Sequence, residues 1–258
     1  MSHSASYRMI LSRMGYYDYQ RGLIFHHLSE QESWKNHMDN CRRFIIKAMD
    51  MYKPAVVTVL GSGWLLDIPL KEIAELAEEV NLIDIIHPPE VRSQVAGMKN
   101  VIIREEDVSG GVITAVWEKA RGRIFFNKLK SLGEINFSEY NPGFEPGLVI
   151  SINILTQLES LPVRFLKGRS NAGEGDFLNL RQELQQKHIS FLKKHKSVLI
   201  TDVSEVITRS SGVTEEAASV LVDLPEGRYR ESWTWQFDST SSDYYNKKSV
   251  FRVSAIII

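Results

Sequence analysis

The spacing of apolar residues changes near residue 54 of the chain. Before that point, apolar side chains recur every three or four positions, most clearly from Trp34 to Met49, which is typical of a helix with one buried stripe. After it, short apolar runs rich in β-branched residues alternate with helical segments, which indicates a parallel sheet covered by helices on both faces. Strands are expected at 55–60, 80–84, 100–105, 148–152 and 197–202. Helices are expected at 7–14, 18–28, 30–52, 68–79, 89–98, 112–120, 153–161 and 177–194.

The pattern changes again at the end of the chain. Tyr229–Phe237 and Ser249–Ile258 are strand-like runs joined by a polar segment, 238–248, and they predict an antiparallel pair that closes the sheet. The predicted fold class is therefore α/β: a Rossmann-like, doubly wound, mostly parallel sheet with an antiparallel closing pair and an N-terminal helical cap. Residues 1–53 form the predicted cap, and residues 54–258 form the predicted Rossmann-like domain.

Composition narrows the class of protein. The chain has 258 residues and a net charge of −1, with Lys and Arg spread along it, so it lacks the basic stripe of a duplex-binding surface and predicts no nucleic-acid partner. A single cysteine, Cys41, makes neither a disulfide framework nor a zinc cage and favours a reducing, cytoplasmic location. No run reaches about 18 apolar residues, so no membrane span is expected. The sequence does not indicate an oligomeric state.

The strongest functional signal is the turn Gly61-Ser62-Gly63, which follows the first strand directly. Such a turn brings backbone N–H groups close to a ligand, although glycines occur in strand-to-helix turns for steric reasons alone. The next strand ends on Asp84, at the spacing of an acid that binds ribose hydroxyls. Asp107 follows the third strand. Either acid also fits an ordinary turn or helix cap, so both interpretations stay open here.

The glycine pattern disfavours a dinucleotide. The position of a third glycine in the dinucleotide fingerprint holds Trp64 or Leu66, whose bulk would obstruct close packing and a pyrophosphate. The turn therefore suits a cofactor without phosphates.

Four segments then occur in a characteristic order: Val59–Gly63 with Asp67, Leu82–Asp84, Glu106–Val108 and Val149–Leu158. From residue 55 to residue 258 the chain resembles the class I S-adenosylmethionine-dependent methyltransferases, including the antiparallel closing pair. The resemblance does not extend to the helical N-terminus. The chain departs from the family pattern at Leu65, where the last glycine is usual, and at Val59 or Leu60, where an acid often precedes the turn.

The resemblance implies S-adenosyl-L-methionine as the cofactor and assigns residues to its parts. The turn, with Ser62 between its two glycines, would pass the methionine part, Asp84 would hold the ribose hydroxyls, and Ser151 would lie beside the sulfur. The residues implied to bind the cofactor are Gly61, Ser62, Gly63, Asp84, Ile85, Asp107, Val108 and Ser151.

Methyl transfer needs an aligned acceptor in a shielded pocket more than an elaborate catalytic apparatus. Asn153, after the fourth strand, is the expected orienting residue, although it also suits a helix cap. His188 and His26 are the candidate general bases; their alternatives are a half-buried surface histidine and a solvated helix position. No histidine has a convincing metal spacing with an acid, so no metal is expected. The N-terminal helices and the polar loop 167–176 are expected to shape the acceptor pocket.

The predicted function is methyl transfer from S-adenosylmethionine to a small-molecule acceptor. The chain lacks the Asn/Asp-Pro-Pro-Tyr/Phe box that amine-modifying nucleic-acid methyltransferases carry after the fourth strand, and the Pro-Cys pair of cytosine-C5 enzymes. Two alternatives stay open: a non-catalytic Rossmann-like ligand-binding domain, and a nicotinamide-dependent oxidoreductase, against which Leu65 and the missing glycine argue.

Overall fold

A computed structural model of the chain describes residues 3–123, 127–209, 211–240 and 247–258. Its described helices of the α type are α1 (Ala5–Met14), α2 (Tyr16–Ser29), α3 (Gln31–Tyr52), α4 (Leu70–Leu76), α5 (Pro89–Val95), α6 (Val112–Ala120), α7 (Ser160–Lys167) and α8 (Glu174–Leu192). The strands are β1 (Val56–Leu60), β2 (Glu79–Asp84), β3 (Val101–Glu105), β4 (Leu148–Ile152), β5 (Ser197–Arg209), β6 (Thr214–Ala218), β7 (Tyr229–Asp238) and β8 (Lys247–Ile257).

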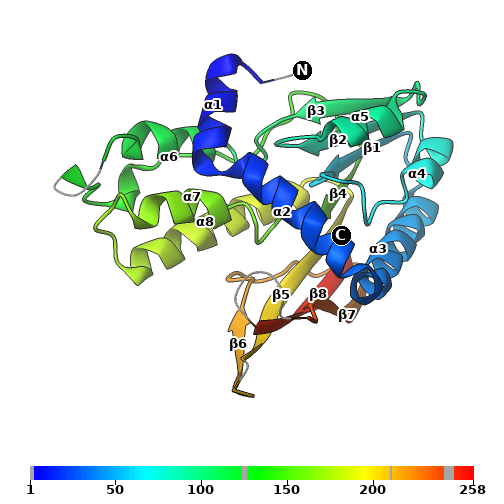
Figure 1. Cartoon of the computed structure of the whole chain (residues 1–258). Coiled ribbons are helices and arrows are strands. Elements are labelled where there is room, and N and C mark those ends of the chain that lie inside the picture. The colour runs from blue at the N-terminus through cyan, green and yellow to red at the C-terminus, as the bar shows by residue number, and fades with distance from the viewer. Residues whose placement is uncertain (1–2, 124–126, 210, 241–246) are drawn as a thin grey trace.

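These strands form one sheet in the order β3-β2-β1-β4-β5-β8-β7, with β6 paired to β5 (Figure 1). The first five strands are parallel, and β8 and β7 close the sheet as antiparallel neighbours. This confirms the predicted fold class. The strand order reverses between β1 and β4, and in open α/β sheets ligands bind at such a point, outside the carboxyl ends of the strands.

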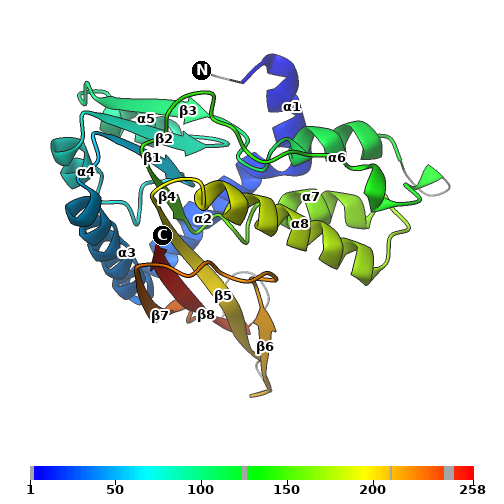
Figure 2. The same cartoon turned by 180° about the vertical axis from the view of Figure 1, so that it is seen from behind.

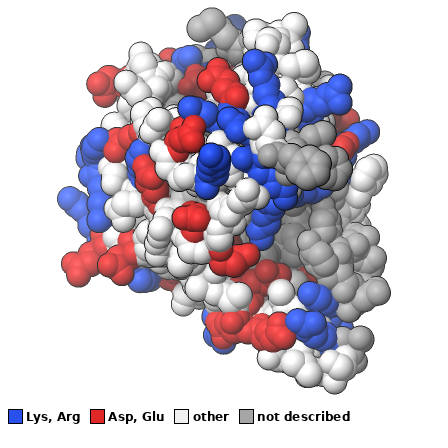
Figure 3. All heavy atoms as spheres, turned by 90° about the vertical axis from the view of Figure 1, so that its left-hand side faces the viewer, with Lys and Arg blue, Asp and Glu red and all other residues white. Residues whose placement is uncertain are grey.

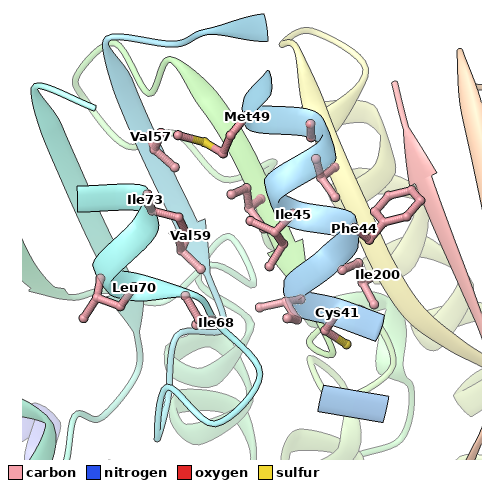
Figure 4. Close-up of a cluster of buried hydrophobic side chains, with 14 of the residues drawn as sticks. Cys41, Phe44, Ile45, Met49, Val57, Val59, Ile68, Leu70, Ile73 and Ile200 are labelled. Carbon is pink, nitrogen blue, oxygen red and sulfur yellow. The ribbon is translucent and has the colours of Figure 1, made fainter. Parts of the chain in front are cut away.

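The apolar pattern of the strands explains the layers. Side chains alternate between the two faces of a strand, so Val57 and Val59 of β1 share one face and Leu60 lies on the other. On the first face α3 and α4 pack against the sheet; Figure 4 shows Ile45 of α3 and Ile73 of α4 in the same cluster. Helices α6, α7 and α8 lie on the other side of the sheet (Figure 2).

The N-terminal helices differ in what they cover. Helix α3 buries its apolar stripe in the main core, whereas α1 packs through Ile10, Leu11 and Met14 against the cluster that α6 and α7 share. Helix α2 crosses in front of the carboxyl ends of the parallel strands (Figure 1). The predicted division into a 1–53 cap and a 54–258 domain stays a prediction.

Three local expectations need correction. The helix expected at 153–161 begins only at Ser160, because Asn153 adopts a left-handed backbone with φ 49° and turns the chain. The polar loop expected at 167–176 is shorter, since Glu174 already opens α8. That loop joins the ends of α7 and α8 that point away from the sheet (Figure 2). Strand β5 continues to Arg209 and pairs with β6, a strand that the sequence did not suggest. Residues 241–246 of the predicted polar connection lie outside the described residues.

Candidate active site

A cavity opens at the carboxyl edge of β1, β2 and β4, and α2 covers one side of it. Its cavity volume is about 150 Å³. Most of the expected cofactor residues line it: Gly61, Ser62, Gly63, Asp84, Ile85, Asp107 and Val108, together with the expected orienting residue Asn153. These residues come from four different strand ends, which the parallel register brings to one edge.

The glycine turn requires a glycine at position 61. Gly61 has φ 84°, and a Cβ added there would lie 2.5 Å from the carbonyl oxygen of Ile152 on β4. The turn therefore fits close against the neighbouring strand only without a side chain. Ser62 lies between the glycines and is fixed by a 2.8 Å hydrogen bond between its Oγ and Nε2 of the buried His87. Leu65 takes up φ 60°, so a bulky residue adopts the left-handed conformation at the place of the usual last glycine.

Asp84 closes the turn from the neighbouring strand. Its Oδ2 accepts a 2.8 Å hydrogen bond from the backbone N–H of Gly63. Burial raises the pKa of this carboxyl to about 6, although the bonds from Gly63, Ile86 and Ile85 lower it. Each carboxylate oxygen accepts more than one hydrogen bond, so Asp84 keeps acceptor capacity for a ligand hydroxyl.

Asp107 lies beside the first helix of the chain. Its Oδ1 accepts a 2.9 Å hydrogen bond from the backbone N–H of Ser109 and another from the Ser109 hydroxyl. Its Oδ2 accepts the hydroxyl of Tyr7 at 3.4 Å. Burial raises the pKa of Asp107. His3 forms a 2.9 Å hydrogen bond with the carbonyl oxygen of Ile85, so α1 and the residues before it cover this end of the site.

Asn153 connects two residues for which the sequence suggested no role. Its Nδ2 donates to Oδ2 of Asp67 at 2.6 Å and lies 3.0 Å from Nε2 of His37, and all three residues line the cavity. Burial raises the pKa of Asp67 to about 6. Asp67 belongs to the first segment of the resemblance, but nothing in the local pattern shows that α3 brings His37 to it.

Three expected site residues lie outside this cavity. Ser151 alternates with Ile150 and Ile152 along β4 and therefore faces α8, where its Oγ forms a 2.8 Å hydrogen bond with Nε2 of His188. Both residues are buried and neither lines the cavity. His26 is buried too, with its Nε2 2.8 Å from the carbonyl oxygen of Phe237. Ser151, His188 and His26 therefore do not line this cavity.

His37, Cys41 and Asp67 each offer a ligand atom within 4.8 Å of the others. These atoms already contact other groups of the chain. The indole N–H of Trp233 donates to Nδ1 of His37 at 3.0 Å, the Asn153 amide donates to Asp67, and Nε2 of His37 lies 3.5 Å from Sγ of Cys41.

The fold is Rossmann-like, with the antiparallel closing pair that the resemblance to class I S-adenosylmethionine-dependent methyltransferases predicts. Comparison with known proteins finds no matching family model and no matching curated protein.

Solved structures to which the chain is similar include a DhpI–SAH complex, at 10% identity and a TM-score of 0.35 over 96% of both chains. The N-methyltransferase NodS from Bradyrhizobium japonicum WM9, in complex with S-adenosyl-L-homocysteine, has 10% identity and a TM-score of 0.35 over 86% of this chain and 87% of its own. The 23S rRNA methyltransferase ErmE has 12% identity and a TM-score of 0.29 over 84% of this chain and 68% of its own.

Proposed function

We propose that this protein is an S-adenosylmethionine-dependent methyltransferase that acts on a small-molecule acceptor. The observation that carries the proposal is the convergence of the glycine turn, Asp84 and Asp107 on one cavity at the switch point of the sheet. Two acceptors and a tight backbone turn suit a nucleoside with ribose hydroxyls and an exocyclic amine, without a phosphate.

In the proposed complex, Asp84 accepts hydrogen bonds from the ribose hydroxyls, and Asp107 accepts a hydrogen bond from the adenine amine. Ile85 and Val108 contact the adenine ring, while the turn from Gly61 to Gly63 passes the methionine part. The cofactor supplies an electrophilic methyl group on sulfur. Asn153, at the end of β4 and on the cavity wall, orients the acceptor.

The remaining walls favour a small acceptor. Trp34, Trp64 and Trp235 line the cavity together with Leu23 and Met38, and α2 covers one side. Aromatic and apolar walls with few polar groups are typical of small-molecule sites.

The surface charge also favours a small acceptor over a nucleic acid: on the face shown in Figure 3, acidic and basic side chains are interspersed. Among the described residues, no helix is long and apolar enough to cross a membrane.

The test is isothermal titration of the full chain with S-adenosyl-L-homocysteine. We expect a measurable dissociation constant in the wild type and a loss of about tenfold or more in Asp84→Asn, because hydrogen bonds to a charged acceptor contribute about 1.5–3 kcal/mol. Asp39→Asn, an exposed acid on α3, serves as the matched control and should bind like the wild type. No heat at millimolar ligand would reject the proposal.

Binding without activity would favour the second candidate function, a non-catalytic ligand-binding domain. The observation that favours it is the position of both expected bases, His188 and His26, outside the cavity. Mass spectrometry of a small-molecule panel, incubated with protein and S-adenosylmethionine, separates the two: a methylated product supports the enzyme.

A further inference from the structure

Asp67 is a carboxylate in the cavity that has no ion-pair partner among the described residues. Its hydrogen-bond donor is the neutral amide of Asn153. Arg42 lowers the pKa of Asp67 less than the hydrogen bonds do, and its guanidinium contacts the carbonyl oxygen of Leu66 and the carboxylate of Asp39 instead. A half-buried carboxylate without a counter-ion loses part of its hydration, and a bound cation offsets that loss.

The imidazole beside Asp67 does not supply the missing charge. His37 stacks on the ring of Trp235, with centroids 3.8 Å apart and an interplanar angle of 5°. Its Nδ1 accepts the indole N–H of Trp233, and burial lowers its pKa to about 3. His37 is therefore neutral and leaves the negative charge of an ionised Asp67 unbalanced.

The cavity that holds Asp67 also has aromatic walls, which include Trp34, Trp235 and Tyr19. The indole N–H of Trp34 donates to the carbonyl oxygen of Phe237 at 2.8 Å, and the hydroxyl of Tyr19 donates to Oε1 of Gln157 at 3.2 Å. A cavity that holds both a carboxylate and aromatic rings suits an organic ammonium, because ring faces and the carboxylate both attract positive charge.

We propose that Asp67 binds the amino group of the methyl acceptor, so that the acceptor class is small primary amines with an apolar or aromatic body. This rests on the proposed methyltransferase function. The bound ammonium first gives one proton to the Asp67 carboxylate, which frees the nitrogen lone pair. This lone pair forms a C–N bond to the transferred methyl carbon while the C–S bond breaks and its electron pair returns to sulfur. The positive charge thereby moves from sulfur to nitrogen, so the product is a secondary ammonium, and Asp67 then releases its proton to water.

The test compares amines with alcohols of the same shape. Saturation-transfer NMR on the full chain, with S-adenosyl-L-homocysteine present, would use 2-phenylethylamine and tryptamine against 2-phenylethanol and tryptophol. We expect the amines to bind at least tenfold more tightly than the alcohols. We also expect Asp67→Asn to remove that preference, while Asp50→Asn, a change at an exposed acid on α3 outside the cavity, keeps it. Equal binding of amine and alcohol to the wild type overturns the proposal without any variant.

A second titration shows whether Asp67 binds the amino group of the acceptor or that of the cofactor. S-adenosyl-L-homocysteine carries an amino group on its methionine-derived part, whereas 5′-methylthioadenosine lacks that group. If Asp67→Asn weakens the first ligand tenfold and leaves the second unchanged, Asp67 pairs with the cofactor, and the acceptor proposal is overturned. Unchanged binding of both ligands supports it.

The same titrations distinguish a failure of the proposed methyltransferase function from a failure of the amine proposal. If the proposed function is wrong, neither nucleoside binds to the wild type. The amine-against-alcohol comparison is then repeated without nucleoside and still decides whether Asp67 binds an amine.

Discussion

At the scale of single residues, the turn after β1 is set by steric fit. The residue at position 61 lies against the end of β4, so its lack of a side chain decides whether the turn, and with it the cavity wall, keeps its shape. Leu65 shows that a left-handed backbone in this turn does not always require glycine, because Leu65 adopts that conformation and packs its side chain into the main core. The order of glycines in a motif is therefore less informative than the contacts of each one.

We predict that Gly61→Ala destabilises the protein and removes nucleoside binding. A Cβ 2.5 Å from the Ile152 carbonyl oxygen, on a backbone with φ 84°, forces the turn or β4 to move. Strained backbone of this kind costs on the order of 1–3 kcal/mol, which lowers the melting temperature by several degrees. Gly97→Ala is the control, because a Cβ there meets nothing within 4 Å. Thermal unfolding curves of the two variants that coincide would show that the close approach is not limiting.

At the scale of elements, α1 and α2 decide how the site is reached. The hydroxyl of Tyr7 on α1 occupies Oδ2 of Asp107, the oxygen available for the adenine amine in the proposed complex. In the proposed complex the Tyr7 hydroxyl and the adenine amine therefore donate to the same oxygen.

We predict that Tyr7→Phe tightens S-adenosyl-L-homocysteine about fivefold, because the ligand no longer displaces a hydrogen bond with a net value of about 1 kcal/mol. Tyr52→Phe is the matched control: its hydroxyl donates to Ile258 O at 2.7 Å, outside the cavity, and its loss should leave the affinity unchanged. Weaker binding in Tyr7→Phe, measured by calorimetry, would show instead that the hydroxyl contacts the ligand.

At the scale of the whole molecule, one buried carboxylate links the N-terminal helices to the far end of the sheet. Glu30, between α2 and α3, accepts hydrogen bonds from the backbone N–H groups and the hydroxyls of Ser239 and Thr240, beyond β7. Burial raises its pKa, but the bonds from Ser239, Ser33 and Thr240 outweigh this and hold it at about 2.

This predicts an acid-sensitive contribution to stability. The folded pKa lies below the ordinary value of 4.5, so the stabilisation is complete above about pH 4.5 and is lost as the pH falls toward 2. Glu30→Gln should lower the free energy of unfolding at pH 7 by about 2 kcal/mol, the value of hydrogen bonds to a charged group.

Urea unfolding at pH 7, 5 and 3 checks this: the difference from the wild type should be equal at the first two values and smaller at the third. Glu32→Gln, an exposed neighbour, is the control. A difference that does not change with pH would assign the effect to packing rather than to charge.

Local pattern determined most of the architecture. Strand alternation and helix periodicity act over a few residues, so the parallel strands, the closing pair and the ends that carry Asp84 and Asp107 were predictable. Elements with weak local signals were not: β6 is exposed along its length, and its pairing with the extended end of β5 follows from the course of the chain.

Tertiary structure alone decided which side chains meet. Asn153 contacts His37 across 116 positions and Asp67 across 86, and no local rule encodes separations of that size. The direction of Ser151 and His188, toward each other and away from the cavity, follows from which strand face and helix face are buried. The sequence thus specified which strand ends carry polar groups, because periodicity is local. Packing specified the wall that the proposed amine contacts, because α3, the β1–α4 segment and β4 meet only in the folded chain.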